Sequence, residues 1–228
     1  MLILSPIVSK WSGSLAGIVG SHNKGGMYLR QRSTPINPNT SFQQAIRNAV
    51  KLFTADWTDV LTSVQRDAWE VYAQNQPLTN TLGESRQIPP LAHYVRSNVS
   101  RDQAGLTRVD DAPVLFTLPT FTDPSFAVTG STGAVSVTFD DADDWANEDG
   151  GALLLYGSRP QSAGINFFNG PYRFLDVIEG DAITPPTSPF AATSPFLGTT
   201  GSKYFFFVRV SRADGRLSSE RFYFDIAA

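Results

Sequence analysis

The chain contains 228 residues, of which 41% are hydrophobic and 17% are charged, against about 25% charged residues in ordinary soluble domains. It has no cysteine, which excludes disulfides, thiolate metal sites and cysteine nucleophiles. No stretch reaches the roughly 18 apolar residues that a membrane helix requires. The N-terminus also lacks the basic segment of a classical secretion signal. We therefore expect no membrane partner.

The formal net charge of −3 is unevenly distributed along the chain. Residues 1–50 carry five basic side chains and no acidic one, residues 51–110 carry a net charge of −1, and residues 111–228 carry −7. Arginine outnumbers lysine by fourteen to four, and arginine is enriched and lysine depleted at protein interfaces. These patterns predict an α+β chain of several parts that works in an assembly: an extended basic arm (1–38), a helical segment (39–110) and a β-sandwich domain (111–228).

The first part does not show the pattern of a compact domain. Five glycines between positions 13 and 26 interrupt every potential helix, and two prolines, at positions 35 and 38, close the segment. Two short extended runs, 15–19 and 27–31, are joined by a link at 22–26 that is rich in Asn and Gly, which predicts a two-stranded ribbon. An isolated ribbon is marginally stable in water. We therefore expect it to lie on the surface of another molecule.

Helical signals begin after Pro38. Apolar residues at spacings of three and four predict a first helix that ends near Trp57, and Thr62 with Gln65 forms the capping box of a second helix. The paired prolines at 89–90 predict the start of a third helix that ends before Gly105. The helical aromatic residues are expected to pack together in a small core; they are Trp57, Trp69, Tyr72 and Tyr94.

From residue 113 onward the hydrophobic period changes to two, which is typical of strands. The expected strands are 125–129, 134–139, 152–156, 173–178, 203–211 and 220–226, with a long loop at 184–200. The strand at 203–211 is apolar enough to be central, and the Asp214-Gly215 pair after it predicts a hairpin. These features predict an antiparallel β-sandwich. The strand 204–211, the Asp214-Gly215 turn and the strand 221–224 resemble a fibronectin type III or immunoglobulin-like module.

Candidate chemistry is sparse. The acidic run at 140–149 is interpreted as a solvated loop, with a cation site as the alternative, because its acids do not alternate as calcium ligands do. The histidines, His22 and His93, fall in different predicted parts, and the sequence contains no G-x-S-x-G, H-E-x-x-H or Walker motif. We therefore expect no enzyme activity, no cofactor and no metal site.

The basic arm raises the question of its partner. Lys10, Lys24, Arg30 and Arg32, interleaved with aromatic residues such as Trp11, have the chemistry to contact phosphates. However, the isoelectric point of about 5.3 opposes a dedicated nucleic-acid binder. A protein neighbour is favoured, because arginine forms forked bonds with carboxylates.

Two sets of residues are therefore predicted to make contacts outside the chain. The predicted attachment residues of the arm are Tyr28, Arg30, Arg32, Asn37 and Asn39. Phe167 and Phe168 are expected at a loop tip, as candidates for an external contact. The alternative for this pair is that the loop anchors into its own domain.

The N-terminal half also resembles a family of tailed-bacteriophage virion proteins, over roughly residues 11–105. The residues that carry the resemblance are Gly13-Ser14-Leu15-Ala16-Gly17, Gly25-Gly26-Met27-Tyr28-Leu29-Arg30-Gln31-Arg32, Pro35-Ile36-Asn37-Pro38-Asn39-Thr40, Trp57, Leu61-Thr62, Gln65-Arg66-Asp67-Ala68-Trp69 and Tyr72-Ala73.

This resemblance implies a non-enzymatic virion protein, assembled in the host cytoplasm. It would be a capsid-associated decoration or minor head component that contacts other virion proteins (major capsid, portal, neck or tail subunits) and copies of itself. Three alternatives stay open. The first is that the chain is a neck or tail component, and the second is that its sandwich binds a host-surface glycan or protein. The third is that its arm contacts DNA inside the head.

Overall fold

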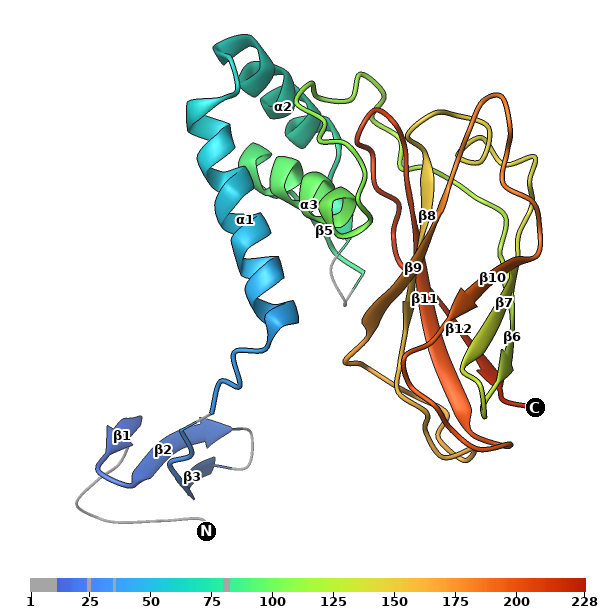
Figure 1. Ribbon diagram of the computed structural model, residues 1–228. Helices are drawn as coiled ribbons and strands as arrows, with labels where there is room; N and C mark the ends of the chain where they lie inside the picture. Colours follow the sequence, from blue (N-terminus) through green and yellow to red (C-terminus); the bar gives the residue numbers. More distant parts are fainter. Residues whose placement is uncertain (1–11, 24–25, 35, 80–82) are drawn as a thin grey trace. The chain divides into compact units, whose positions relative to one another are not determined.

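The computed structural model of the chain describes residues 12–23, 26–34, 36–79 and 83–228 (Figure 1). The chain divides into two compact units, residues 1–41 and 42–228, and each is described by itself. The predicted boundaries at 38 and 110 stay predictions.

The described residues of the first unit form a small antiparallel sheet with the strand order β1-β2-β3. Its strands are β1 (Gly13–Leu15), β2 (Ile18–Asn23) and β3 (Gly26–Gln31). The predicted pairing of the 27–31 run with the run before it is confirmed, but the prediction of two strands was wrong, because the run 15–19 is not one strand. It turns at Ala16, which has a positive φ of 49°, and the backbone N–H of Arg32 donates to the carbonyl of Gly17 at 2.8 Å, directly after this turn.

Three helices follow among the described residues: α1 (Ser41–Asp59), α2 (Ser63–Asn75) and α3 (Pro90–Gln103). All three were predicted. The capping box at the start of α2 is confirmed, because the backbone N–H of Gln65 donates to Thr62 Oγ1 at 3.3 Å and the backbone N–H of Thr62 donates to Gln65 Oε1 at 2.9 Å. A short pair of strands between α2 and α3, β4 (Leu78–Thr79) and β5 (Ser85–Arg86), was not predicted.

The helical aromatic residues pack together, as predicted. Trp69 and Tyr94 are fully buried, and their rings meet edge-on with centroids 5.6 Å apart. Trp57 and Tyr72 join this cluster at 5.7 Å from Tyr94 and Trp69, respectively. The indole N–H of Trp69 donates to the carbonyl of Asp110 at 2.9 Å, so the cluster also fixes the segment that follows α3.

Residues 113–228, all of which are described, form two antiparallel sheets with the orders β10-β7-β6 and β12-β11-β8-β9 (Figure 1). We call this part the two-sheet region. The strands are β6 (Ser125–Thr129), β7 (Ala134–Thr138), β8 (Ala152–Gly157), β9 (Arg173–Glu179), β10 (Phe190–Thr193), β11 (Lys203–Ser211) and β12 (Arg221–Ile226). Both sheets contribute to one buried cluster, which includes Val135, Val137, Leu155, Phe206 and Val208. The arrangement is compatible with the predicted β-sandwich.

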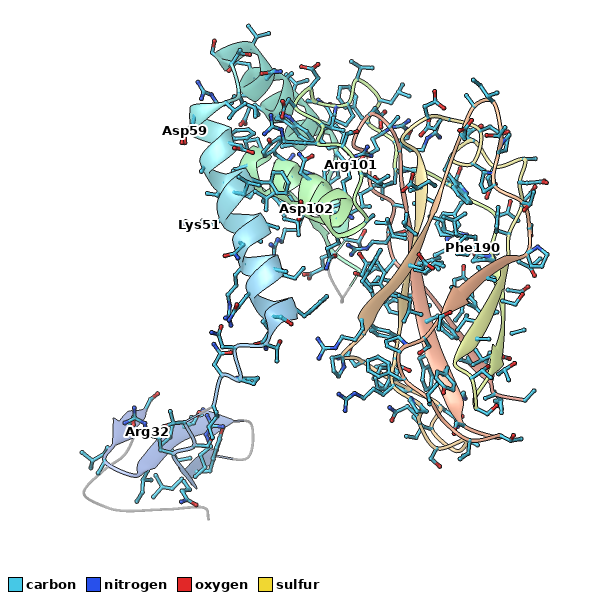
Figure 2. All side chains as sticks on the ribbon, in the orientation of Figure 1. Arg32, Lys51, Asp59, Arg101, Asp102 and Phe190 are labelled. Atoms are coloured by element: carbon cyan, nitrogen blue, oxygen red, sulfur yellow. The ribbon has the colours of Figure 1, made fainter. Side chains whose placement is uncertain are left out.

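Strand β10 was not predicted. It lies inside the segment 184–200, whose Pro, Ser and Thr content indicated a loop. Its four residues, which begin at Phe190 (Figure 2), pair with β7 from Phe190↔Val137 to Thr193↔Ala134. The pairing partner therefore makes this segment a strand. Strand β11 lies between β12 and β8, which confirms its predicted central place.

Buried side chains of helix α3 form hydrogen bonds with the two-sheet region. Arg101 is 1% exposed, and its guanidinium donates to the carbonyls of Thr107, Gly150 and Arg212 at 2.8, 3.2 and 2.8 Å (Figure 2). Ser97 Oγ donates to the carbonyl of Gly215, at the tip of the β11–β12 hairpin. The helices and the two sheets therefore belong to one packed unit.

Candidate interaction surfaces

The N-terminal sheet places two of the predicted attachment residues on the same face of β3. Tyr28 and Arg30 lie opposite Ser21 and Val19 of β2. Because directly opposite residues share a face and alternate residues point the same way, Tyr28 and Arg30 lie on one face. Arg30 is exposed and Tyr28 is half-buried. Arg32 follows the strand and is also exposed.

The other face of this sheet carries most of its apolar side chains. They are Leu15, Ile18, Met27 and Leu29, and the registers of β1 with β2 and of β2 with β3 place His22 and Gln31 on the same face. Leu15 is 68% exposed and Ile18 is 46% exposed. Three strands this short bury little apolar surface of their own. Both faces of the sheet therefore offer contacts to another surface.

The remaining arm residues form a turn after β3. The backbone N–H of Asn39 donates to Asn37 Oδ1 at 3.2 Å, and Asn39 has a positive φ of 47°, a conformation that asparagine tolerates well. Both residues are exposed and belong to the first unit. Three other residues of the predicted basic arm, Lys10, Trp11 and Lys24, lie outside the described residues.

The loop before β9 contains two neighbouring phenylalanines that point to different surroundings. Phe167 is 80% exposed, in agreement with its expected place at a loop tip. Phe168 instead turns toward the outer face of the four-stranded sheet, where its ring stacks on Phe205 at 5.3 Å and meets Tyr172 edge-on at 5.2 Å. The alternative reading, a loop that anchors into its own domain, therefore describes Phe168.

A surface that was not among the predicted contact sites lies on strands β11 and β12. Side chains of the outer face alternate along both strands, and the cross-strand pairs are Phe207↔Phe222, Phe205↔Phe224 and Lys203↔Ile226. Tyr204, Phe206 and Val208 of β11 point the other way, into the core. The β12 side chains of this outer face are exposed; Phe222, Phe224 and Ile226 are 59%, 60% and 49% exposed.

Two cations of β11 lie along this outer face. The ammonium of Lys203, a residue that is 5% exposed, lies 4.1 Å from the centroid of Phe224 and 5.4 Å from that of Phe205. The guanidinium of Arg209 lies 5.9 Å from the centroid of Phe207 and forms a salt bridge with Glu220. Within the described residues, Lys203 has no carboxylate within salt-bridge distance, 4.0 Å.

A shallow cleft of about 330 Å³ borders the same surface. Its walls are formed by Pro124, Ser125, Phe126, Phe222, Tyr223 and Phe224. Next to it, the backbone N–H of Val128 donates to the Asp225 carboxylate at 2.8 Å, so that a side chain of β12 occupies this donor of strand β6.

The acidic run makes contacts inside the chain. Arg212 forms ion pairs with Glu148 at 2.6 Å and with Asp144 at 3.3 Å. Asp143 accepts a hydrogen bond from the Trp145 indole at 3.1 Å. The structure shows no group of three or more His, Cys, Asp or Glu arranged to hold a metal ion within its described ranges. These carboxylates hold the loop to its neighbours, a role that the sequence did not predict.

The two histidines belong to different units. His22 is exposed on β2. His93 is 3% exposed, and its ring packs edge-on against Tyr72 with centroids 5.2 Å apart. Burial and, to a smaller extent, the positive charge of the nearby Arg96 lower the pKa of His93 to about 4. His93 is therefore a neutral packing residue near neutral pH.

None of the helices in the described part of the chain is long and apolar enough to span a membrane. No model of a known protein family matches the chain, and no curated protein matches it either.

Proposed function

We propose that the chain is a non-enzymatic structural protein of a tailed-bacteriophage virion. In this proposal it is a capsid-associated decoration or minor head component, which attaches to neighbouring subunits through its arm and helices. The proposal starts from the resemblance carried by the Gly-rich opening and by the Trp57 to Ala73 motif. Its partners would be other virion proteins, with a neck or tail location as the alternative.

The observation that carries the proposal is the small N-terminal sheet. It leaves Leu15 and Ile18 exposed on one face and presents Arg30 on the other. Within the described residues, neither Arg30 nor Arg32 forms a salt bridge. A sheet this small gains stability when neighbours cover Leu15 and Ile18 on one face and offer carboxylates to Arg30 on the other. Subunits of an assembly on the two sides of the sheet would supply these contacts.

We also propose that the two-sheet region is a fibronectin type III-like module. Seven short antiparallel strands in sheets of three and four match the size of such sandwiches. The chain moves between the two sheets after β7, β9 and β10, and β10 returns to pair with β7. Architecture of this kind is shared by proteins of many functions, so it supports a projecting module without naming its partner.

A second candidate function is recognition of a host-surface glycan or protein by the two-sheet region. Phe167 favours it, since an 80% exposed aromatic ring at a loop tip is available for contact. Phe167 and Phe168 do not form a paired aromatic platform on this loop, because the Phe168 ring is stacked on Phe205. Glycan-array binding by the full chain, lost in Phe167→Ser, is the result that distinguishes this candidate.

The proposal is tested in phage particles produced from the genome that encodes the chain. Immunogold labelling of wild-type particles should locate the protein on the virion. In a genome that encodes Arg30→Ser together with Arg32→Ser, incorporation should fall at least about tenfold, because each forked arginine–carboxylate bond contributes roughly 1.5–3 kcal/mol.

The matched control is Arg86→Ser, which removes an exposed cation of β5, outside the arm and the helices, and should leave incorporation unchanged. Added salt should weaken attachment of the wild-type chain, because charge attraction between exposed groups is screened. Unlabelled wild-type particles would contradict the proposal. Normal incorporation of the double variant would contradict the attachment role of the arm.

A further inference from the structure

Asn169 is the one asparagine of the sequence that is followed by glycine. It is exposed and lies in the loop between β8 and β9, directly after Phe168. Asparagine is chemically labile in this context, because the backbone nitrogen of the next residue can attack the carbon of its side-chain amide. Glycine favours this attack, since it has no Cβ to shield the nitrogen and its backbone is free to reach the required conformation. The Asn169-Gly170 pair is therefore a candidate for modification without an enzyme.

Neither reacting group of this pair is held by the fold. Within the described part of the chain, the Asn169 amide forms no hydrogen bond and the Gly170 N–H donates none. Asn147, in the loop before β8, shows the contrast, because its amide donates to the carbonyls of Asp141 and Asp143 at 2.7 and 3.0 Å. Rotation of the Asn169 side chain toward the Gly170 nitrogen therefore breaks no hydrogen bond of the folded chain.

The same ring closure is obstructed at Asp214-Gly215, in the β11–β12 hairpin. Aspartate forms the same cyclic imide with a following glycine, with loss of water in place of ammonia. Here the Gly215 N–H donates to the carbonyl of Arg212 at 3.0 Å, and the Asp214 carboxylate accepts from Arg216 Nε at 2.6 Å. The folded chain thus contains a free site and an engaged site for the same reaction.

We propose that Asn169 is a site of spontaneous modification in the folded chain. The Gly170 nitrogen forms a bond with Asn169 Cγ, the bond from Cγ to Nδ2 breaks, and ammonia leaves with the proton of the Gly170 N–H. The product is a cyclic succinimide, which water opens at either carbonyl. Opening at Cγ gives aspartate. Opening at the main-chain carbonyl gives isoaspartate, in which the main chain runs through Cβ and Cγ.

The isoaspartate product changes a loop segment that is closed on itself. The hydroxyl of Tyr172 donates to the carbonyl of Phe168 at 3.2 Å, and Asn169 and Gly170 lie between these two residues. The ring of Phe168 stacks on Phe205, which is 6% exposed, with centroids 5.3 Å apart. Isoaspartate adds a main-chain carbon to this closed segment and a carboxylate directly after Phe168. We expect this product to loosen the stack and to expose Phe205.

The first test follows modification of the full chain during storage in mildly alkaline buffer, by peptide mapping with mass spectrometry. A protein isoaspartyl methyltransferase identifies isoaspartate, because it methylates the free α-carboxylate of that residue. Asn169 should react at least about tenfold faster than Asn166, a difference of about 1.4 kcal/mol in activation free energy. Asn166 is the matched control, since it is also exposed but precedes Phe167. Equal rates at the two positions, or no isoaspartate at residue 169, overturn the proposal.

The second test compares the folded chain with the chain unfolded in urea, which isolates the contribution of the fold. Asn169 should react at a similar rate in both states, because the folded chain leaves its reacting groups free. Asp214 should form isoaspartate in urea and react at least about tenfold more slowly in the folded chain, where hydrogen bonds must break first. Strong protection of Asn169 by folding overturns the proposal. Equal reaction of Asp214 in the two states overturns the role assigned to these hydrogen bonds.

Two variants separate the longer main chain of isoaspartate from its added charge. Freshly prepared Asn169→Asp carries the carboxylate without the extra main-chain carbon, and Asn169→Gln reacts slowly because its longer side chain must close a larger ring. Binding of a hydrophobic dye should rise in the stored wild-type chain with its isoaspartate content and stay at the fresh wild-type level in both variants. Dye binding that stays constant while isoaspartate accumulates overturns the expected exposure of Phe205.

This inference goes beyond the proposed function, because it concerns the loop between β8 and β9 and requires no partner. The full chain with Arg30→Ser and Arg32→Ser should therefore form isoaspartate at the wild-type rate. A different rate in that variant overturns the assignment of the reaction to this loop alone. A failure of the arm to attach to virions, by contrast, leaves the measurement at Asn169 unaffected.

Discussion

At the scale of single residues, His93 is the clearest case of a side chain that is tuned by its surroundings. It lies on α3 against Tyr72 of α2, and its Nε2 has no hydrogen-bond partner within the described residues. A protonated imidazole in this position would be buried without a compensating charge, since the nearby charged group is the cation of Arg96. The folded chain therefore holds the neutral form.

The resulting pH dependence is a testable property of His93. Its pKa is about 4 in the folded chain and about 6.5 in the unfolded one. The unfolded state therefore binds the proton first, and stability that is present above pH 6.5 is lost as the pH falls toward 4. We expect a loss of about 2 kcal/mol between pH 7 and pH 5, measured by urea unfolding.

Two variants isolate this contribution. His93→Gln should remove the loss between pH 7 and pH 5, whatever its effect on stability at neutral pH. His22→Gln should keep the loss, because His22 is exposed on β2. An unchanged pH dependence in His93→Gln would mean that another group is responsible.

At the scale of elements, the sequence predicts those helices and turns that are marked by local signals. The capping box of α2, the prolines that begin α3 and the Asp214-Gly215 turn act within a few residues, and all three are found where they were predicted. Strands β1, β4 and β10 have two to four residues. These short segments are strands because they hydrogen-bond to a neighbouring strand, and the pattern of their own residues is too short to predict a strand.

The cap of α2 gives a prediction at this scale. Thr62→Ala removes the acceptor of the Gln65 backbone N–H and should lower the free energy of unfolding by about 1 kcal/mol. Thr62→Ser keeps the hydroxyl and should stay close to the wild type. Thermal or urea unfolding of the two variants measures the difference. Equal losses in both would show that the threonine methyl group, and not the hydrogen bond, carries the effect.

The candidate surfaces were predictable only where exposure follows from local sequence. Exposure of Arg30 and Phe167 follows from their places on a small sheet and at a loop tip. Alternation along 221–226 shows that Phe222 and Phe224 share a face, but it does not show which face is covered. On the outer face of the four-stranded sheet, the segment after α3 packs through Ala104 and Leu106 into a cluster with Ala152, Leu154 and Tyr156, whereas Phe222 and Phe224 stay exposed. That division is a property of tertiary packing.

At the scale of the whole molecule, the buried guanidinium of Arg101 connects the helices to the two sheets. Its four hydrogen bonds reach residues far apart in the sequence, from Thr107 to Arg212. Three of the acceptors are backbone carbonyls, which lose their partner if the side chain is removed. A buried polar group without a partner costs about 1–3 kcal/mol.

We therefore expect the second unit to unfold in one transition. Two signals, the amide hydrogen exchange of the helices and that of the two-sheet region, should report the same free energy of opening in the wild type. Arg101→Met should lower stability by about 3 kcal/mol or more and separate the two signals. Arg86→Met, a change at an exposed arginine of β5, is the control. Coincident signals in Arg101→Met would show that apolar packing alone couples the parts.

The place of β12 in the chain has a consequence for the timing of assembly. Synthesis proceeds from the N-terminus, and domains generally fold as their residues emerge from the ribosome. The glycine-rich sheet therefore leaves the ribosome before the two-sheet region, and Phe222, Phe224 and Ile226 emerge after every other strand of their sheet. These apolar side chains of β12 can take their places only once β11 is available to pair with them.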